Sequence, residues 1–485
     1  MKRPGFTKAA SAAGLAVAML ALSGCLTLGP DYERPELPLP DQYVKASSAG
    51  AETVQDDWWK LFEDRELDAL VAEALAANQD LAEAAARVDE ARARAGVAQA
   101  DRLPQISAGA SGARDQFSEA TAQFPPGVPL EMDTYRGTVN LSFELDFWGR
   151  LARLSEAARA ELLASVEGRR HVRLAVIAET VSAYFDLLAL DRQLAIAAAT
   201  LESRQEAVRL QRLRFDAGTI SGLDLAQAEA ELAATEAAVP FRQRALRQTE
   251  DRMAVLLGRI GGEIARADDG DTSPETGALY ALRVPEIPVG LPSQLLARRP
   301  DLAAAEQRLI ASNARIGVAR AAFFPTIALT GYSGSESDEL SGLFKSGTSI
   351  WGIAAGLLQP IFQGGKAIRG VEIAEARRRQ SLAGYAKSVQ VAFADVEDAL
   401  IARSTGTTER QALERQVEAL TRARRLANLR YEAGDSSYLD LLDAERGLFR
   451  AQLEWVAARR AELGAAVLLF KALGGGWEAP AASTS

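Results

Sequence analysis

The 485-residue chain has one cysteine and one histidine, and these shortages exclude most kinds of site chemistry. A single cysteine cannot form a disulfide within the chain. The single histidine, His171, cannot supply an HExxH-type zinc site, and its helix-forming surroundings predict a solvent-facing residue. Gly364-Gly365-Lys366 lacks the rest of a phosphate-binding loop, which indicates a turn. The sequence therefore predicts no enzyme, no metal site and no cofactor.

The sequence also lacks an excess of basic residues and, after the N-terminus, long apolar runs. The formal net charge is −10, and removal of the first 24 residues, with three basic and no acidic side chains, makes it −13. Nucleic-acid binding requires a basic surface to meet phosphates, so we exclude it. After the N-terminus no segment has about 18 consecutive apolar residues, which excludes a transmembrane helix in the mature chain. Such a chain crosses a bilayer only with strands closed into a barrel.

The N-terminus predicts the compartment. Three basic residues precede an Ala- and Leu-rich run over about 9–22, and the tetrapeptide LSGC (22–25) follows, which together form a secretory signal. The tetrapeptide resembles a bacterial lipobox, which implies cleavage before Cys25 and a covalent lipid on Cys25. An uncleaved anchor is the alternative, although the run is short for a membrane span. Residue 26 is Leu, not the Asp that retains such lipoproteins in the inner membrane, so the resemblance favours the outer membrane.

Two segments of the chain are near-copies of each other. Residues 213–229 read LRFDAGTISGLDLAQAE and residues 429–445 read LRYEAGDSSYLDLLDAE, with ten of seventeen positions identical at an offset of 216. A second match, between 93–107 and 314–328, has an offset of 221. The period is too long for a solenoid, so we expect a duplicated fold whose halves pack together. The predicted boundaries are 1–24 signal, 25–57 lipid-anchored linker, 58–262 first repeat, 263–291 linker, 292–476 second repeat and 477–485 disordered tail.

The body reads mostly as helix, with four short strands. Helix-forming residues continue without a clear break over about 150–216, which predicts a rod on the order of 100 Å long and favours coiled-coil-like packing. Residues 137–147 alternate apolar and polar side chains, the period of a strand, and 104–113, 325–332 and 349–358 are weaker candidates. Their lengths match transmembrane strands, with ordinary hairpins on a soluble core as the alternative. Four strands leave open edges, so a membrane location requires oligomerisation.

Several motifs between 25 and 476 together resemble outer-membrane efflux factors of the TolC/OprM type, in the lipoprotein branch that serves RND pumps. In chain order they are Gly29-Pro30-Asp31-Tyr32 with Pro35, Trp58-Trp59, Asn78-Gln79-Asp80-Leu81, Asp146-Phe147-Trp148-Gly149-Arg150, Leu291-Pro292, Arg299-Pro300-Asp301-Leu302 and the two glycine-centred turns. Each motif alone is weak. Their order, their spacing and the internal duplication make the resemblance specific.

The resemblance implies a mainly α fold with a small β part, in which three chains build one twelve-stranded transmembrane β-barrel and a long α-helical periplasmic barrel. It implies a homotrimeric outer-membrane channel of a tripartite efflux system, which conducts small molecules and works with a periplasmic adaptor and an inner-membrane RND-type pump. The only attached group it implies is the lipid on Cys25, in contact with outer-membrane lipid. A conduit for type I polypeptide secretion and a non-channel periplasmic helical scaffold lipoprotein stay open as alternatives.

The duplicated turns are candidate adaptor-docking tips, formed by Gly218 and Thr219 in the first copy and by Gly434 and Asp435 in the second. Glycine tolerates the left-handed conformation that a helix reversal needs. A serine three residues before an aspartate follows each turn, which fits a capping box. The two aspartates of these pairs are therefore either helix caps or functional residues.

An acidic and a basic residue, Asp443 and Arg446, occur only in the second copy, where the first has Gln227 and Ala230. A surface ion pair worth a few tenths of a kcal/mol is one interpretation. In a trimer, however, one aspartate becomes a ring of three at a constriction. By resemblance the gate of the closed periplasmic entrance comprises Leu439, Asp443 and Arg446, with Asp224, Asp440 and Tyr431 as a TolC-like second set. Ser436 stands where TolC-type chains carry Arg, which favours the first set, and we expect Asp443–Arg446 contacts between helices to hold the closed state.

Overall fold

The computed structural model of the chain describes residues 27–38, 40, 56–118, 120, 130–266, 277–287 and 292–475. The predicted signal peptide, the lipidation residue Cys25 and the predicted tail lie outside the described residues. The elements are η1 Trp58–Phe62, α2 Arg65–Ala77, α3 Gln79–Ala100, β1 Gln105–Gln116, β2 Glu131–Leu145, α4 Arg150–Asp216, α5 Gly222–Leu256, α6 Ala278–Ala281, α7 Pro292–Arg298, α8 Pro300–Ala321, β3 Thr326–Ser337, η2 Leu340–Gly342, β4 Ser349–Leu358, α9 Lys366–Glu432 and α10 Tyr438–Ala472. The predicted fold class, mainly α with a small β part, is confirmed.

The internal repeat is visible in the lengths of the long helices. Helices α4 and α9 each contain 67 residues, and α5 and α10 each contain 35. The predicted unbroken helix over about 150–216 is α4, and Pro240 lies inside α5 without ending it. Among the described residues, none of the helices combines the length and the apolar character that crossing a membrane demands.

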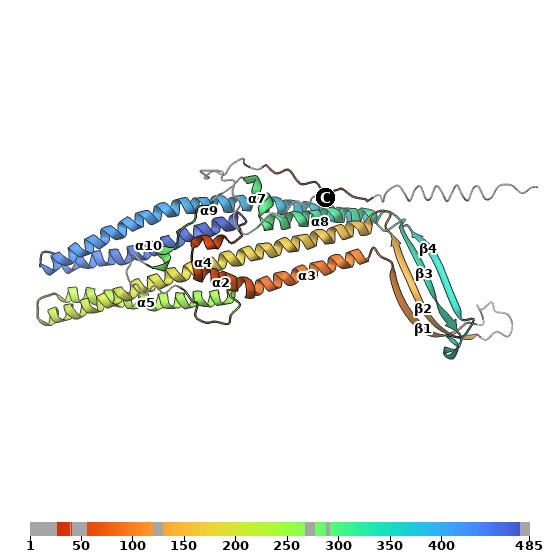
Figure 1. Cartoon of the computed structure of the whole chain (residues 1–485), viewed down its shortest axis with the longest axis horizontal. Helices are drawn as coiled ribbons and strands as arrows, with labels where there is room; N and C mark the ends of the chain where they lie inside the picture. The colour runs from red at the N-terminus through yellow and green to blue at the C-terminus, as the bar shows by residue number, and fades with distance from the viewer. Residues whose placement is uncertain are drawn as a thin grey trace, which may run out of the picture. The chain divides into compact units, whose positions relative to one another are not determined.

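The four strands form one antiparallel sheet in the order β1-β2-β3-β4 (Figure 1). Strand β2 begins at Glu131 rather than near 137, because its first residues continue the ladder with β1 as far as the pair Gln116–Glu131. Apolar side chains on the sheet are largely uncovered by the chain, with Val139 52% exposed and Ile353 82% exposed. Strands β1 and β4 form the two edges of this sheet.

The chain divides into two compact units, which do not coincide with the two sequence repeats. The first contains 1–36, 88–165 and 305–385, and the second contains 37–87, 166–304 and 386–485. In the first unit, α4 and α8 pack through small side chains, Ala157 and Ala160 against Ala311 and Ala314. Alanine permits this close approach of the two helices.

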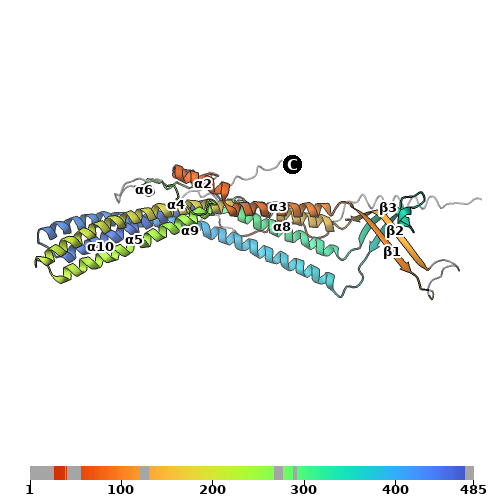
Figure 2. The same cartoon turned by 90° about the horizontal axis from the view of Figure 1, so that it is seen from below.

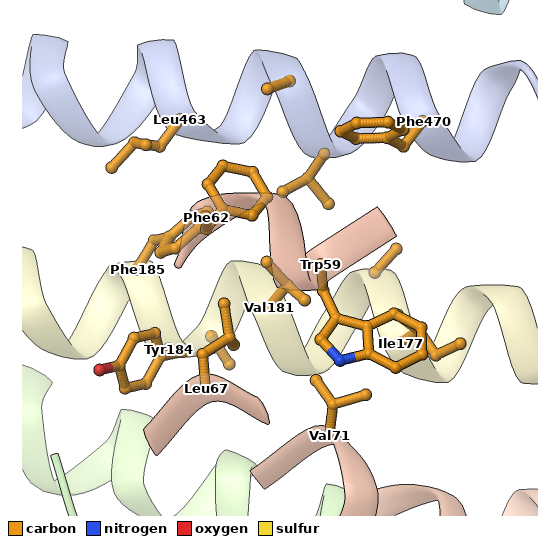
Figure 3. Packing of buried hydrophobic residues seen from close by; sticks show 14 of the residues in the cluster. Trp59, Phe62, Leu67, Val71, Ile177, Val181, Tyr184, Phe185, Leu463 and Phe470 are labelled. Carbon is orange, nitrogen blue, oxygen red and sulfur yellow. The ribbon is translucent and has the colours of Figure 1, made fainter. Parts of the chain in front are cut away.

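The main hydrophobic core lies in the second unit (Figure 3). Helix α2 is capped by Asp64, whose carboxylate accepts hydrogen bonds from the Leu67 N–H at 3.0 Å and from the Tyr184 hydroxyl at 2.8 Å. The Phe62 and Phe185 rings meet edge to face with centroids 5.0 Å apart. Residues of η1 and α2 therefore share one hydrophobic core with α4 and α10.

Candidate functional site

The two helical hairpins of the second unit, α4–α5 and α9–α10, end in turns of one geometry (Figures 1 and 2). Gly218 and Gly434 have φ of +71° and +78°, in the left-handed region that suits glycine. The Thr219 N–H donates to the Arg214 carbonyl and the Asp435 N–H to the Arg430 carbonyl, both at 2.9 Å. These are the long bonds of a Schellman ending. The candidate docking residues Gly218, Thr219, Gly434 and Asp435 thus lie at equivalent exposed positions.

Helices α5 and α10 both begin with a complete capping box. In the second hairpin the Ser437 N–H donates to the Asp440 carboxylate at 3.1 Å, and the Asp440 N–H donates to the Ser437 hydroxyl at 3.3 Å. Ser221 and Asp224 make the same pair of bonds in the first hairpin. The capping interpretation of Asp224 and Asp440 therefore accounts for their geometry, and a gate role for them stays a prediction.

Tyr431 on α9 joins the second hairpin to the first. Its hydroxyl accepts hydrogen bonds from the Gln211 amide and from the Arg214 guanidinium on α4, both at 2.8 Å. The Arg214 guanidinium also lies 5.2 Å from the centre of the Tyr431 ring, within the range of a cation–π contact. Tyr431, placed by the sequence in the second gate set, is thus a polar link between the hairpins.

Arg446 forms a second link between the hairpins, through a residue that sequence reasoning missed. Its guanidinium donates to the Glu231 carboxylate on α5 at 2.5 Å. Arg204 on α4 also bonds to Glu231, and donates to the Glu231 backbone carbonyl at 3.2 Å. The Arg204 side chain is only 5% exposed, Glu231 17% and Arg446 38%. One nearly buried carboxylate therefore serves one guanidinium from each hairpin.

The repeat itself carries a signal that identifies Arg204 and Glu231. At the offset of 216 their counterparts in the second copy are Leu420 and Gly447. A Cβ built on Gly447 would lie 3.2 Å from the Leu420 side chain, so these two residues pack closely where the first copy has an ion pair. A charged pair at positions where the other copy has an apolar residue and a glycine indicates a function found in one hairpin only.

Asp443 and Leu439 are exposed on α10. Their spacing of four residues places them on one face of the helix. Within the described part of the chain, no hydrogen bond or ion pair involves the Asp443 carboxylate. Arg446 bonds to Glu231 and not to Asp443, so within one chain the expected Asp443–Arg446 contact is not formed. Contacts of Asp443 with another chain stay a prediction.

Behind the two tips, the four helices enclose a small apolar cluster, and α4, α9 and α10 line a cleft. The cluster contains Tyr438, Leu441 and Leu442 of α10. Burial raises the pKa of Tyr438 to about 12 and raises the pKa of Glu445 above its usual value. A cleft of about 200 Å³ is lined by Glu445 together with Arg204, Arg424 and Phe449, among others. The structure thus buries titratable groups behind the tip while Asp443 stays in contact with solvent.

Three comparisons place the chain among known proteins. The family model described as outer membrane efflux protein matches residues 70–259 and 291–475. The cation efflux system protein CusC of Escherichia coli O6:H1 is 35% identical over 467 residues, which cover 95% of this chain and 97% of CusC. Outer membrane protein OprJ of Pseudomonas aeruginosa is 35% identical over 490 residues, which cover 99% of this chain and 97% of OprJ.

A solved structure agrees with these matches. The crystal structure of a membrane protein from Pseudomonas aeruginosa superposes with a TM-score of 0.84 at 35% identity, and the match covers 92% of this chain and all of that one. The two stretches that the family model matches fall on the two sequence repeats, and the relatives are matched almost from end to end. The chain belongs to the outer membrane efflux protein family.

Proposed function

We propose that the chain is the outer-membrane channel subunit of a tripartite efflux system, that it acts as a homotrimer, and that it works with a periplasmic adaptor and an inner-membrane RND-type pump. Family membership supports efflux as the activity. The sheet supports assembly, because the backbone groups of the edge strands β1 and β4 and the exposed apolar side chains need partners that one chain does not supply. Other copies of the chain would supply them.

The proposal includes a covalent lipid on Cys25, which would anchor the chain in the outer membrane. This part of the proposal rests on the tetrapeptide Leu22-Ser23-Gly24-Cys25. Mass measurement of the purified chain tests it: an acylated N-terminal cysteine is expected, and an unmodified thiol at that position contradicts the proposal.

The proposed gate is the second hairpin, α9–α10. Leu439 and Asp443 are exposed and lie one turn apart, so threefold symmetry would turn them into an apolar ring and a ring of carboxylates around the periplasmic entrance. The tips around Gly218 and Gly434 would receive the adaptor. Adaptor binding would then shift the population toward an open entrance, provided that the adaptor binds the open state more tightly.

The observation that carries this gate is the shared carboxylate, Glu231. Movement of the second hairpin separates Arg446 from Glu231, whereas Arg204 belongs to the first hairpin and stays. The carboxylate therefore keeps a counterion in the open state. Because Arg446 is partly exposed, its release costs on the order of 1 kcal/mol, far less than leaving a buried charge without a counterion. A contact of this strength suits a reversible latch.

Single-channel conductance of the trimer in a planar bilayer tests the gate. We expect the double variant Asp443→Ala/Arg446→Ala to conduct several-fold more often than the wild type, because it loses both the carboxylate ring and the latch. Arg424→Ala is the matched control, since Arg424 pairs with Glu445 within the second hairpin at 3.8 Å and, among the described residues, forms no ion pair with the first hairpin. If the double variant conducts like the wild type, the gate assignment is wrong.

A further inference from the structure

The motif Gly29-Pro30-Asp31-Tyr32 supports the family resemblance but has no part in the gate. In the structure the motif lies in residues 27–36, a segment of the first unit without helix or strand (Figure 1). We call this segment the strap. Its backbone is held just before the motif and at the second residue of the motif. The Leu28 N–H donates to the Trp148 carbonyl at 3.1 Å, and the Asn313 side-chain amide donates to the Pro30 carbonyl at 2.8 Å.

Where the strap crosses α8, Gly29 of the strap lies directly against Gly317 of the helix. A Cβ built on Gly29 would lie 2.6 Å from the Gly317 Cα, and one built on Gly317 would lie 2.4 Å from the Leu28 carbonyl oxygen. Gly29 also has φ of +99°. No side chain fits at either position without moving the strap away from the helix.

Charged side chains fasten the strap on both helices beneath it. Glu306 on α8, 8% exposed, accepts the Tyr32 hydroxyl at 3.0 Å and two guanidinium bonds from Arg34 at 2.7 and 2.6 Å. Arg153 on α4 donates to Asp31 at 2.7 Å and to the Leu28 carbonyl at 3.2 Å. Burial near Glu306 raises the pKa of Tyr32, so this hydroxyl remains a donor at any physiological pH.

The two polar receiving groups on α8, Glu306 and Asn313, are specific to the second repeat, whereas Gly317 is a glycine in both. At the offset of 221, Glu306 corresponds to Ala85, Asn313 to Arg92 and Gly317 to Gly96. A Cβ on Gly96 would meet nothing within 4 Å, in contrast to Gly317. In the part of the chain that the structure describes, the side-chain hydrogen bonds of Glu306 and Asn313 all go to the strap. Without the strap, both side chains would lose these partners.

We propose that the face of α4 and α8 in the first unit is a binding groove for an extended peptide, and that its ligand is this chain's own strap. The strap belongs to neither repeat, yet it contacts α4 of the first and α8 of the second. It acts as a staple that docks after the helices have packed, satisfies their buried polar groups and fastens the two repeats beside the sheet. The recognised features are a Gly-Pro backbone, an aromatic hydroxyl and an arginine two residues later.

The experiment releases the strap from the folded protein. The full chain is exported with a non-lipoprotein signal, so that no lipid holds the fragment, and a protease site is inserted after residue 45. After purification of the trimer and cleavage, gel filtration measures how much fragment stays bound, and gel mobility after heating measures trimer stability. In the otherwise unchanged chain we expect the fragment to stay bound, and a synthetic peptide of residues 27–36 to replace it in trans.

Two pairs of variants make the test specific. Arg34→Ala is expected to release the fragment about tenfold to a hundredfold faster, as for lost bonds to a charged group, whereas Glu33→Ala, at an exposed neighbour, leaves release unchanged. Gly317→Ala is expected to speed release although alanine favours the helix, and Gly96→Ala is the control in the other repeat. Equal release from all variants, or unchanged heat resistance after the strap is lost, would overturn the proposal.

Discussion

At the scale of single residues, the structure differs from the sequence prediction mainly in the partners of the charged side chains. The sequence identified Arg446 as special because its counterpart in the first copy is Ala230. It did not identify the partner, because Glu231 is 215 residues away in the chain. His171 was expected to face solvent, but it is half-buried in a cleft of about 390 Å³ with Arg299, Asp301 and Lys471. Ion pairs and burial depend on neighbours that local sequence does not specify.

Glu231→Gln is predicted to destabilise the chain by about 2–4 kcal/mol, because it leaves the guanidinium of Arg204 buried without its counter-charge. Thermal unfolding measured by circular dichroism tests this value. The matched control is Glu229→Gln, whose partner Arg212 is 63% exposed, and we expect a loss below about 1 kcal/mol there. Equal losses in the two variants would contradict the buried ion pair.

The stability of the chain should fall as the pH drops toward 5, partly through His171. Burial, with Lys471 and Arg299 nearby, lowers the pKa of His171, and Asp301 opposes the shift without reversing it. The folded state therefore binds fewer protons than the unfolded state, whose His pKa is about 6.5. Stability from this residue is complete above about 6.5 and is lost as the pH falls through the folded-state pKa.

His171→Gln should flatten this part of the pH profile. The measurement is the difference in melting temperature between pH 7.5 and pH 5 for the wild type and the variant. A variant with the same difference as the wild type would show that carboxylates alone set the profile.

At the scale of elements, the tips were predicted most fully. The helix end, the reversal and the next cap are encoded within about ten residues. A glycine ends the first helix, and a serine with an aspartate three residues later caps the second. The structure has these features at both Gly218 and Gly434. The long helices α4 and α9 follow from uninterrupted helix-forming composition. The start of β2 was missed because it depends on pairing with β1, which lies on another segment.

Gly434→Ala is predicted to destabilise the α9–α10 hairpin by about 1 kcal/mol, since alanine at a φ of +78° is strained. The effect is conformational, because nothing lies within 4 Å of a Cβ at this position. Hydrogen exchange of the amides beside the turn should accelerate. Gly384→Ala, inside α9 and with open space, is the control and should be neutral or stabilising.

At the scale of the whole molecule, the two copies of the duplicated fold differ at three places. The first copy alone has the Arg204–Glu231 pair, the second alone has Asp443 and Arg446, and only the second has the strap-binding side chains Glu306 and Asn313. Shared residues build hairpins and sheet, whereas the unequal ones make the proposed latch and staple. The core of η1, α2, α4 and α10 holds the bases of both hairpins.

Trp58→Ala tests this core. Trp58 is fully buried and stacks on Phe470 with ring centroids 4.7 Å apart, so its loss should cost about 3–5 kcal/mol and loosen η1 and α2. Limited proteolysis near residue 60 and thermal unfolding report the two effects. Phe241→Ala, at a residue 60% exposed, should change neither, and a Trp58 variant that unfolds like the wild type would place the stabilising contacts elsewhere.

The sequence by itself determined the duplication, the helical body, the four strands, the two tips and the family. These features rest on local periodicity, on turn and cap residues within one or two helical turns, and on motif order. The tertiary structure alone decided the partners of Arg446, Glu306 and His171, and the groove under the strap. The physical reason is sequence distance: Arg34 and Glu306 lie 272 residues apart, and only the packed helices bring such groups within hydrogen-bond reach.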